Sequence, residues 1–181
     1  MHLIGGLDQA DDGEIIVNGN HLSKMNQKQL SAYRATQTGF VFQSFYLEPQ
    51  YTVFDNIRIA LMIAKVPFQE HKFKIKEALR QVGLLDKINV RTANLSGGEK
   101  QRVAIARAFI NNPPIILADE PCGNLDSSNS EIIMNLLEDL HKRGKTIILV
   151  THNLSDAEKA DRIIELRDGV IIRDEKKNPM V

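Results

Sequence analysis

Short apolar runs alternate with amphipathic segments along much of the chain. Strands are predicted at residues 14–17, 39–42, 115–118 and 146–150. The segment between the last two carries apolar residues at helical spacing and ends at Gly144. Because strand and helix alternate and the later strands are apolar throughout, we expect an α/β fold whose mostly parallel sheet is covered on both faces.

The middle of the chain is predicted to be helical. Helices are expected over about 52–65, 70–82 and 96–111, the last one stopped by two prolines. The third of these helices is apolar around much of its circumference, as is typical of a buried helix. Residues of about 52–110 are therefore expected to form a helical subdomain inserted into the sheet.

Local capping signals predict where the helices begin. Asn26 is expected to cap a helix that ends near Arg34. Capping boxes, in which a side chain satisfies the free amides of the first turn, are predicted for the pairs Thr52 and Asp55, Ser96 and Glu99, Ser128 and Glu131, and Ser155 and Glu158. Residues 1–7 are expected to be the end of a helix, and residues 163–172 a hairpin.

Composition and charge restrict the class of protein. The 181 residues are 43% hydrophobic and 25% charged, which suits one globular domain. Lys+Arg and Asp+Glu both number 23, a balance that argues against a dedicated nucleic-acid binder. The longest apolar runs fall far below the ~20 residues that a membrane span needs, and the first residues lack the pattern of a signal peptide. Any contact with a membrane is therefore expected through a partner.

Polar residues follow three of the predicted strands, where ligands bind in open α/β sheets. Asp119 is a candidate Mg²⁺ ligand, and the Gln43 amide can contact the metal or a water. Glu120 is a candidate base that polarises a water for attack on a phosphoryl group, and His152 can donate to a phosphate oxygen. Each residue taken alone also fits a strand that simply ends in solvated side chains.

The segment Leu95–Glu99 is a second kind of candidate site. Ser96 starts a helix, and Gly97 and Gly98 leave its first amides uncovered. The helix dipole favours an anion at that end, so a phosphate could bind there. An ordinary helix start capped by Ser96 and Glu99 explains the same residues.

In this order and spacing the motifs resemble those of the ATP-binding subunits of ABC transporters, from one end of the chain to the other. Leu95–Glu99 is similar to the family signature, Gln43 to the Q-loop glutamine, Ile115–Asp119 to Walker B with Glu120 as the catalytic carboxylate, Asn124–Asp126 to the D-loop, and His152 to the switch histidine. The resemblance implies a P-loop NTPase-like fold that uses ATP and Mg²⁺. Nucleotide-binding residues would then be Gln43, Ser96, Gly97, Gly98, Glu99 and Asp126; catalytic residues, Glu120 and His152; metal ligands, Asp119 and Gln43.

The resemblance also implies partners and a location. Two such subunits pair head to tail around ATP, the signature of one facing nucleotide held by the other. Transmembrane permease subunits bind them at the cytoplasmic face of the membrane. Residues 38–45 and 121–126 are similar to the branch that serves lipoprotein release or the export of macrolides and peptides.

The phosphate loop of that family, G-x-x-x-x-G-K-[ST], does not occur in the sequence. Gly144-Lys145-Thr146 is a false match, because Asp139 stands where the first glycine is required. Residues 1–8 resemble the segment downstream of the loop, so residues 1–181 are expected to be a single domain lacking its N-terminal strands. Neighbouring strands are then expected to keep unpaired edges, and this chain alone is not expected to bind ATP normally.

Two alternatives remain. The chain could be an inactive fragment or a non-hydrolysing subunit that donates its signature to a partner's site. A DNA-maintenance ATPase shares the signature and Walker B, but carries a long coiled coil or large insertion between the Q-loop and the signature. No heptad run separates Gln43 from Ser96, which argues against that class.

Overall fold

Three parallel strands form the centre of the fold, in the order β3-β4-β5. The structure is a computed structural model that describes residues 1–177. The strands are β3 (Thr38–Phe42), β4 (Ile115–Asp119) and β5 (Thr146–Val150). Phe42 pairs with Asp119, and Asp119 with Val150, so the carboxyl ends of all three strands meet at one edge. The predicted parallel α/β arrangement is confirmed here.

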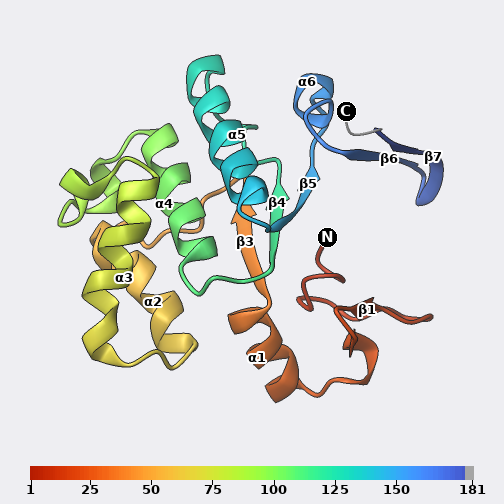
Figure 1. Cartoon of the computed structure of the whole chain (residues 1–181), viewed down its shortest axis with the longest axis horizontal. Helices are drawn as coiled ribbons and strands as arrows, with labels where there is room; N and C mark the ends of the chain where they lie inside the picture. The colour runs from red at the N-terminus through yellow and green to blue at the C-terminus, as the bar shows by residue number, and fades with distance from the viewer. Residues whose placement is uncertain (178–181) are drawn as a thin grey trace.

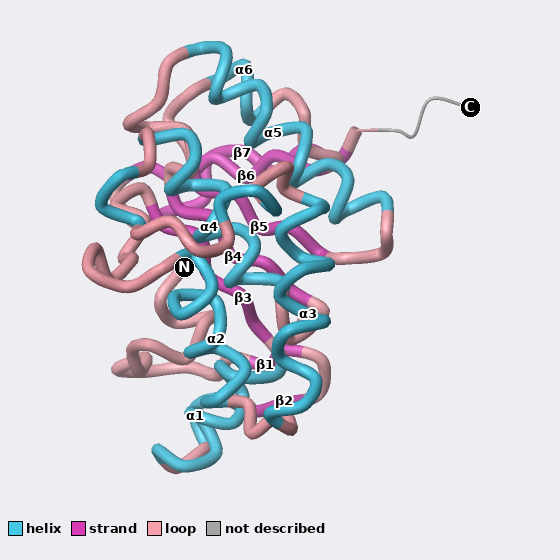
Figure 2. Tube along the Cα trace, turned by 90° about the vertical axis from the view of Figure 1, so that its left-hand side faces the viewer, coloured by secondary structure: helices cyan, strands magenta, loops and turns pink. Residues whose placement is uncertain are grey.

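Helices pack beside this sheet (Figures 1 and 2). The α-helices are α1 (Gln27–Thr36), α2 (Val53–Ile63), α3 (Phe68–Gln81), α4 (Gly97–Phe109), α5 (Ser127–Lys142) and α6 (Leu154–Ala157). Short 3-10 turns are η1 (Leu22–Lys24), η2 (Leu85–Lys87) and η3 (Thr92–Asn94). In Figure 1, α2, α3 and α4 lie together to the left of β3. None of the helices within residues 1–177 is both long and apolar enough to span a bilayer.

Two antiparallel hairpins complete the described chain. β1 (Ile16–Val17) pairs with β2 (Asn20–His21), and β6 (Arg162–Arg167) pairs with β7 (Val170–Lys176). The second hairpin was predicted from the sequence, whereas β2 was not. Within residues 1–177, β5 pairs only with β4 and β6 only with β7, so each keeps one edge without a strand partner.

The core is continuous from β4 through α4 into the α2–α3 pair. Ile105 of α4 and Ile116 of β4 are fully buried, as are Ile57 of α2 and Ile75 of α3. α4 therefore lies between the sheet and the other two helices, which explains why its sequence is apolar around most of its circumference.

Three of the predicted helix caps are confirmed. The Ser96 hydroxyl accepts a bond from the Glu99 amide at 3.2 Å, and the Glu99 carboxylate accepts one from the Ser96 amide at 2.8 Å. Asn26 caps α1 with the same reciprocal pattern, and Thr52 caps α2. Because these bonds join residues three apart, local sequence is enough to predict them.

Two predicted capping boxes are wrong. α5 is capped by Asp126 instead of Ser128, and α6 by Asn153 instead of Ser155. In each case the side-chain oxygen of a residue two positions before the predicted cap accepts a bond from a backbone N–H of the first turn. The Asn153 side chain, for example, accepts from the Ser155 amide at 2.9 Å.

Residues 1–7 have the hydrogen bonds of a helix end. The Leu7 amide donates to the His2 carbonyl, and the Gly6 amide donates to the Leu3 carbonyl. Gly6 has a φ of 65°, so the pattern is that of a Schellman end with glycine in the left-handed region. The Tyr33 hydroxyl donates to the Ile4 carbonyl at 2.9 Å and fixes the segment against α1.

Candidate active site

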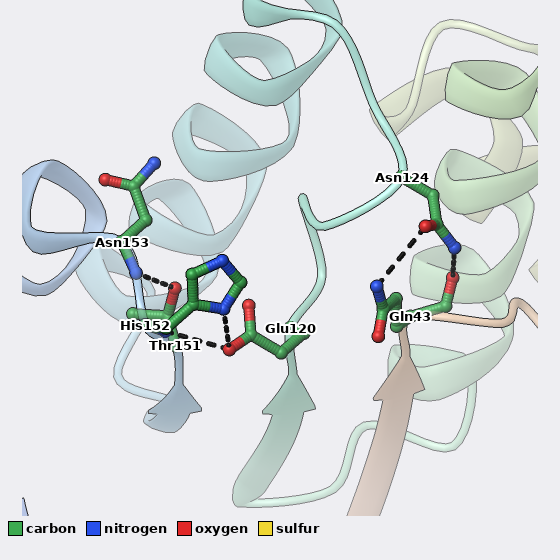
Figure 3. A network of polar contacts seen from close by, with 6 residues as sticks. All are labelled: Gln43, Glu120, Asn124, Thr151, His152 and Asn153. Carbon is green, nitrogen blue, oxygen red and sulfur yellow. Dashed lines mark hydrogen bonds and ion pairs between the residues drawn. The ribbon is translucent and has the colours of Figure 1, made fainter.

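Four of the predicted site residues lie at the carboxyl edge of the sheet, and Figure 3 shows three of them, Gln43, Glu120 and His152. Asp119 is the last residue of β4, and Glu120 follows it. Gln43 follows β3, and His152 lies two residues beyond β5. The Glu120 amide donates to the Val150 carbonyl at 2.9 Å, which extends the sheet bonding to the start of the site.

Glu120 and His152 are directly bonded. Glu120 Oε1 accepts both the His152 backbone amide, at 2.8 Å, and His152 Nδ1, at 2.7 Å. The glutamate side chain is 22% exposed and the histidine side chain 82%, so the carboxylate is shielded while the ring reaches solvent. Within residues 1–177, Glu120 Oε2 and His152 Nε2 have no hydrogen-bond partner. One oxygen of the carboxylate is therefore fixed and the other is available to a water.

The backbone at Glu120 is strained. Its φ is 45°, a region that non-glycine residues rarely adopt. A turn follows at once, in which the Gly123 amide donates to the Glu120 carbonyl at 3.0 Å. Strain of this kind persists where the surrounding structure fixes it, and it is found most often at functional sites.

Few side-chain oxygens at this edge of the sheet are free to bind Mg²⁺. Asp119 makes no side-chain hydrogen bond or ion pair with residues 1–177, and the same is true of Gln43 Oε1. The described chain contains no group of three or more His, Cys, Asp or Glu side chains placed to hold a metal. Mg²⁺ is commonly bound by one or two protein oxygens together with waters and substrate phosphates. Asp119 and Gln43 fit that requirement, and a closed protein cage is absent from residues 1–177.

Ser96 caps α4, and Gly97, Gly98 and Glu99 form its first turn. The backbone amide of Ser96 lowers the pKa of the Glu99 carboxyl by hydrogen bonding, so this carboxylate serves the cap. The amides of Gly97 and Gly98 have no acceptor within residues 1–177. A Cβ on Gly98 would overlap the Asn129 side chain, which shows how closely the starts of α4 and α5 approach.

Asp126 acts as a structural cap in this chain. Its carboxylate accepts bonds from the Asn129 amide at 2.8 Å, the Ser128 hydroxyl at 2.7 Å and the Asn129 side chain at 2.8 Å. These bonds, led by that from the Asn129 backbone, lower the pKa of Asp126 to about 2. The charged carboxylate is thus favoured by folding of this turn.

The stabilisation from Asp126 is expected to depend on pH. Because the pKa in the folded chain is depressed, the contribution is fully present above about pH 4 and is lost as the pH falls through about 2. Asp126→Asn keeps an oxygen acceptor but does not titrate. The free energy of unfolding of the wild type and of the variant should be measured by urea unfolding at pH 2 to 5. The difference between the two free energies is expected to become smaller as the pH falls. A constant difference across that range would contradict the assigned role.

A cavity of about 420 Å³ adjoins Glu120 and His152, between the turn after β4 and the loop after β5. Cys122 lines it and is partly buried, and burial raises the pKa of its thiol to about 11. The thiol is therefore protonated and a poor nucleophile.

Two residues of this region were not found by sequence reasoning. Gln101 of α4 is completely buried, and its amide donates to the carbonyls of Phe42 at 3.1 Å and Pro121 at 2.6 Å. Asn124 bonds to Gln43. Gln101 gave no signal, because it stands between Lys100 and Arg102 in the sequence of α4, and Asn124 had none beyond its place in the D-loop.

Comparisons with known proteins show which family the chain belongs to. The family model described as "ABC transporter" matches residues 1–123. The chain belongs to the ABC transporter family. It is an ATP-binding domain of that family, related to the macrolide-export and lipoprotein-releasing branch, as the sequence predicted.

Two relatives and one solved structure illustrate the relation. The lipoprotein-releasing system ATP-binding protein LolD of Bacteroides fragilis is 45% identical, over 95% of this chain and 80% of that protein. The macrolide export ATP-binding/permease protein MacB of Chlorobaculum tepidum is 45% identical, over 98% of this chain and 27% of that protein. The dimeric ATP-binding cassette MJ0796, bound to ADP and Pi, superposes with a TM-score of 0.89 at 38% identity, over 99% of this chain and 79% of that one.

Proposed function

We propose that this chain belongs to the ATPase subunit of an ABC exporter, which acts at the interface of a head-to-tail pair of ATP-binding subunits; residues 1–181 by themselves are not expected to bind ATP normally. The observation that carries the proposal is the bond between Glu120 and His152 at the sheet edge, beside Gln43. Glu120 and His152 are the catalytic residues, and Asp119 and Gln43 are the metal ligands.

The chemistry assigned to the site follows from its free atoms. Glu120 Oε2 accepts a hydrogen bond from the attacking water, while Oε1 stays fixed by His152. His152 can bond Glu120 through Nδ1 and a phosphate oxygen through Nε2 at the same time only as imidazolium, when both nitrogens donate. Bound Mg²⁺ would neutralise charge on the phosphates.

The partners are inferred from the family. Ser96, Gly97, Gly98, Glu99 and Asp126 are proposed to face the nucleotide held by a second subunit, as suits the free amides at the start of α4. The dimeric state of MJ0796 supports such pairing. Permease subunits would hold the pair at the cytoplasmic face of a membrane. The names of the MacB and LolD relatives point to a macrolide-like or lipoprotein cargo, and a peptide is the third cargo class that we propose.

We further infer that residues 1–181 form one domain that lacks a phosphate loop, with residues 52–110 as its helical subdomain. The sequence contains no G-x-x-x-x-G-K-[ST] motif. The open edge of the apolar strand β5 suits a further strand beside it. Residues 1–181 by themselves therefore do not supply the lysine and amides with which a phosphate loop holds the β- and γ-phosphates.

The signature residues Ser96–Glu99 also suit a second candidate function. A chain with an intact signature but no phosphate loop could complete a partner's site without hydrolysing ATP itself. The two functions differ in whether Glu120 acts on ATP, which an experiment can decide.

The test compares ATP binding and turnover by residues 1–181 with those of a version extended by the first strands and phosphate loop of a relative. The short chain is expected to be inactive and the extended one active, with replacement of the loop lysine by alanine as the control. Turnover by the short chain that Glu120→Gln abolishes would refute the need for a phosphate loop. An inactive extended chain that nevertheless raises turnover by an intact partner would favour the second candidate, provided that Ser96→Ala removes the effect.

A further inference from the structure

Gln43 and Asn124 are joined by two side-chain bonds although 81 positions separate them. Gln43 Nε2 donates to Asn124 Oδ1 at 3.3 Å, and Asn124 Nδ2 donates to the Gln43 backbone carbonyl at 3.3 Å. Figure 3 shows the two amides facing each other next to Glu120. The pair therefore lies within the proposed active site.

The backbone carbonyl of Gln43 fixes the orientation of the side-chain amides of both Asn124 and Gln43. A carbonyl oxygen can only accept a hydrogen bond, so Asn124 must present its NH₂ group to it. That leaves Asn124 Oδ1 to face the Gln43 side chain, and Oδ1 can only accept. Gln43 must then present its own NH₂ group to Asn124. As a result Gln43 Oε1 is turned away from Asn124, and no residue of the described chain bonds to it.

The turn beneath Gln43 is shaped to receive its side chain. A Cβ on Gly123 would lie 2.7 Å from Gln43 Nε2 and 3.1 Å from its Cδ, so a larger residue would displace the amide. The turn itself is fixed, because the Leu125 amide donates to the Cys122 carbonyl at 3.0 Å. Gln101 holds the turn and the end of β3 together from the buried side.

We propose that Asn124 is a positioning residue that sets the orientation of the Gln43 amide, so that oxygen and not nitrogen is presented to the metal or the water. This inference rests on the proposed function only for the ligand of Gln43 Oε1. The orientation itself follows from the two bonds to Asn124. Mg²⁺ takes oxygen ligands, so a Gln43 amide turned the other way would present a donor and could not coordinate it.

The first experiment needs no ATP turnover. In residues 1–181, the side-chain NH₂ signal of Gln43 is assigned by NMR from its loss in Gln43→Ala, and its exchange with water is measured. Asn124→Ala is expected to speed this exchange about fivefold, the factor equivalent to one hydrogen bond of ordinary net strength. Asn124→Leu should have a similar effect, because it keeps the size of the side chain but also removes the acceptor of the Gln43 NH₂ group. Asn20→Ala, in β2, is the control and should change nothing. Unchanged exchange in both Asn124 variants would overturn the proposal.

The second experiment tests the purpose of the orientation. In the extended chain, the Mg²⁺ concentration that gives half-maximal turnover is expected to rise about fivefold in Asn124→Ala, with the thermal midpoint unchanged because Asn124 is exposed. Faster amide exchange with unchanged Mg²⁺ dependence would overturn the link to the metal. If the extended chain does not hydrolyse ATP at all, the proposed function fails, whereas the NMR result still decides whether Asn124 positions Gln43.

Discussion

Replacing Glu120 with glutamine is expected to lower ATP turnover of the extended chain by about 10²–10⁴-fold, the usual contribution of a general base. The substitution keeps an oxygen that can accept both bonds from His152, so the shape of the site is preserved. Only the negative charge and the basicity of the free oxygen are lost. The measurement is steady-state turnover, together with ATP binding, which should be nearly unchanged.

Glu131→Gln provides a matched control for this prediction. Glu131 lines the same cavity as Glu120, but it belongs to α5, and its carboxylate makes no side-chain bond within residues 1–177. Its replacement should leave turnover near the wild-type value. Equal losses in the two variants would mean that the charge of the cavity matters and not the base, and would contradict the role given to Glu120.

Gly39→Ala is expected to destabilise the fold by about 3 kcal/mol or more, at the upper end of what overpacking costs. Gly39 is the second residue of β3, and a Cβ there would overlap the backbone carbonyl of Ala108 in α4 and lie 2.8 Å from Ile116 Cδ1. A backbone group cannot rotate aside as a side chain can, so β3 and α4 would have to separate. Because domains of this size are stable by only about 5–15 kcal/mol, the midpoint of urea unfolding should fall sharply.

Gly97→Ala is the corresponding control. A Cβ at Gly97 would make ordinary contact with Leu125 Cδ2 at 3.5 Å, and alanine favours helix over glycine. Stability should therefore stay the same or rise. If Gly39→Ala unfolded at the wild-type urea concentration, the close contact between β3 and α4 would be refuted.

Local sequence predicted those parts of the fold that depend on neighbouring residues. The reciprocal cap of Ser96 and Glu99 spans three positions, and the apolar run before Asp119 is enough to indicate a buried strand. The cap of α5 was predicted wrongly because Asp126 and Ser128 both suit the position. Asp126 lies earlier in the chain and bonds the Asn129 amide, and Ser128 donates to it.

The sheet edge could be predicted because polar residues follow each apolar strand, and parallel register brings such residues together. The bonds inside the site could not. Glu120 and His152 are 32 positions apart, and Gln43 and Asn124 are 81 apart, so their contacts depend on how the turns after the strands are folded. No periodicity or motif carries that information.

The buried Gln101 side chain has a mechanical consequence. One rigid amide holds the end of β3 and the turn after β4 to α4, with bonds to the carbonyls of Phe42 and Pro121. α4 is also the helix that starts at Ser96. Gln101 therefore links three parts of the site through α4. These are the first turn of the helix, Gln43 next to Phe42, and Glu120 next to Pro121. A tilt of α4 cannot move one of them and leave the other two in place.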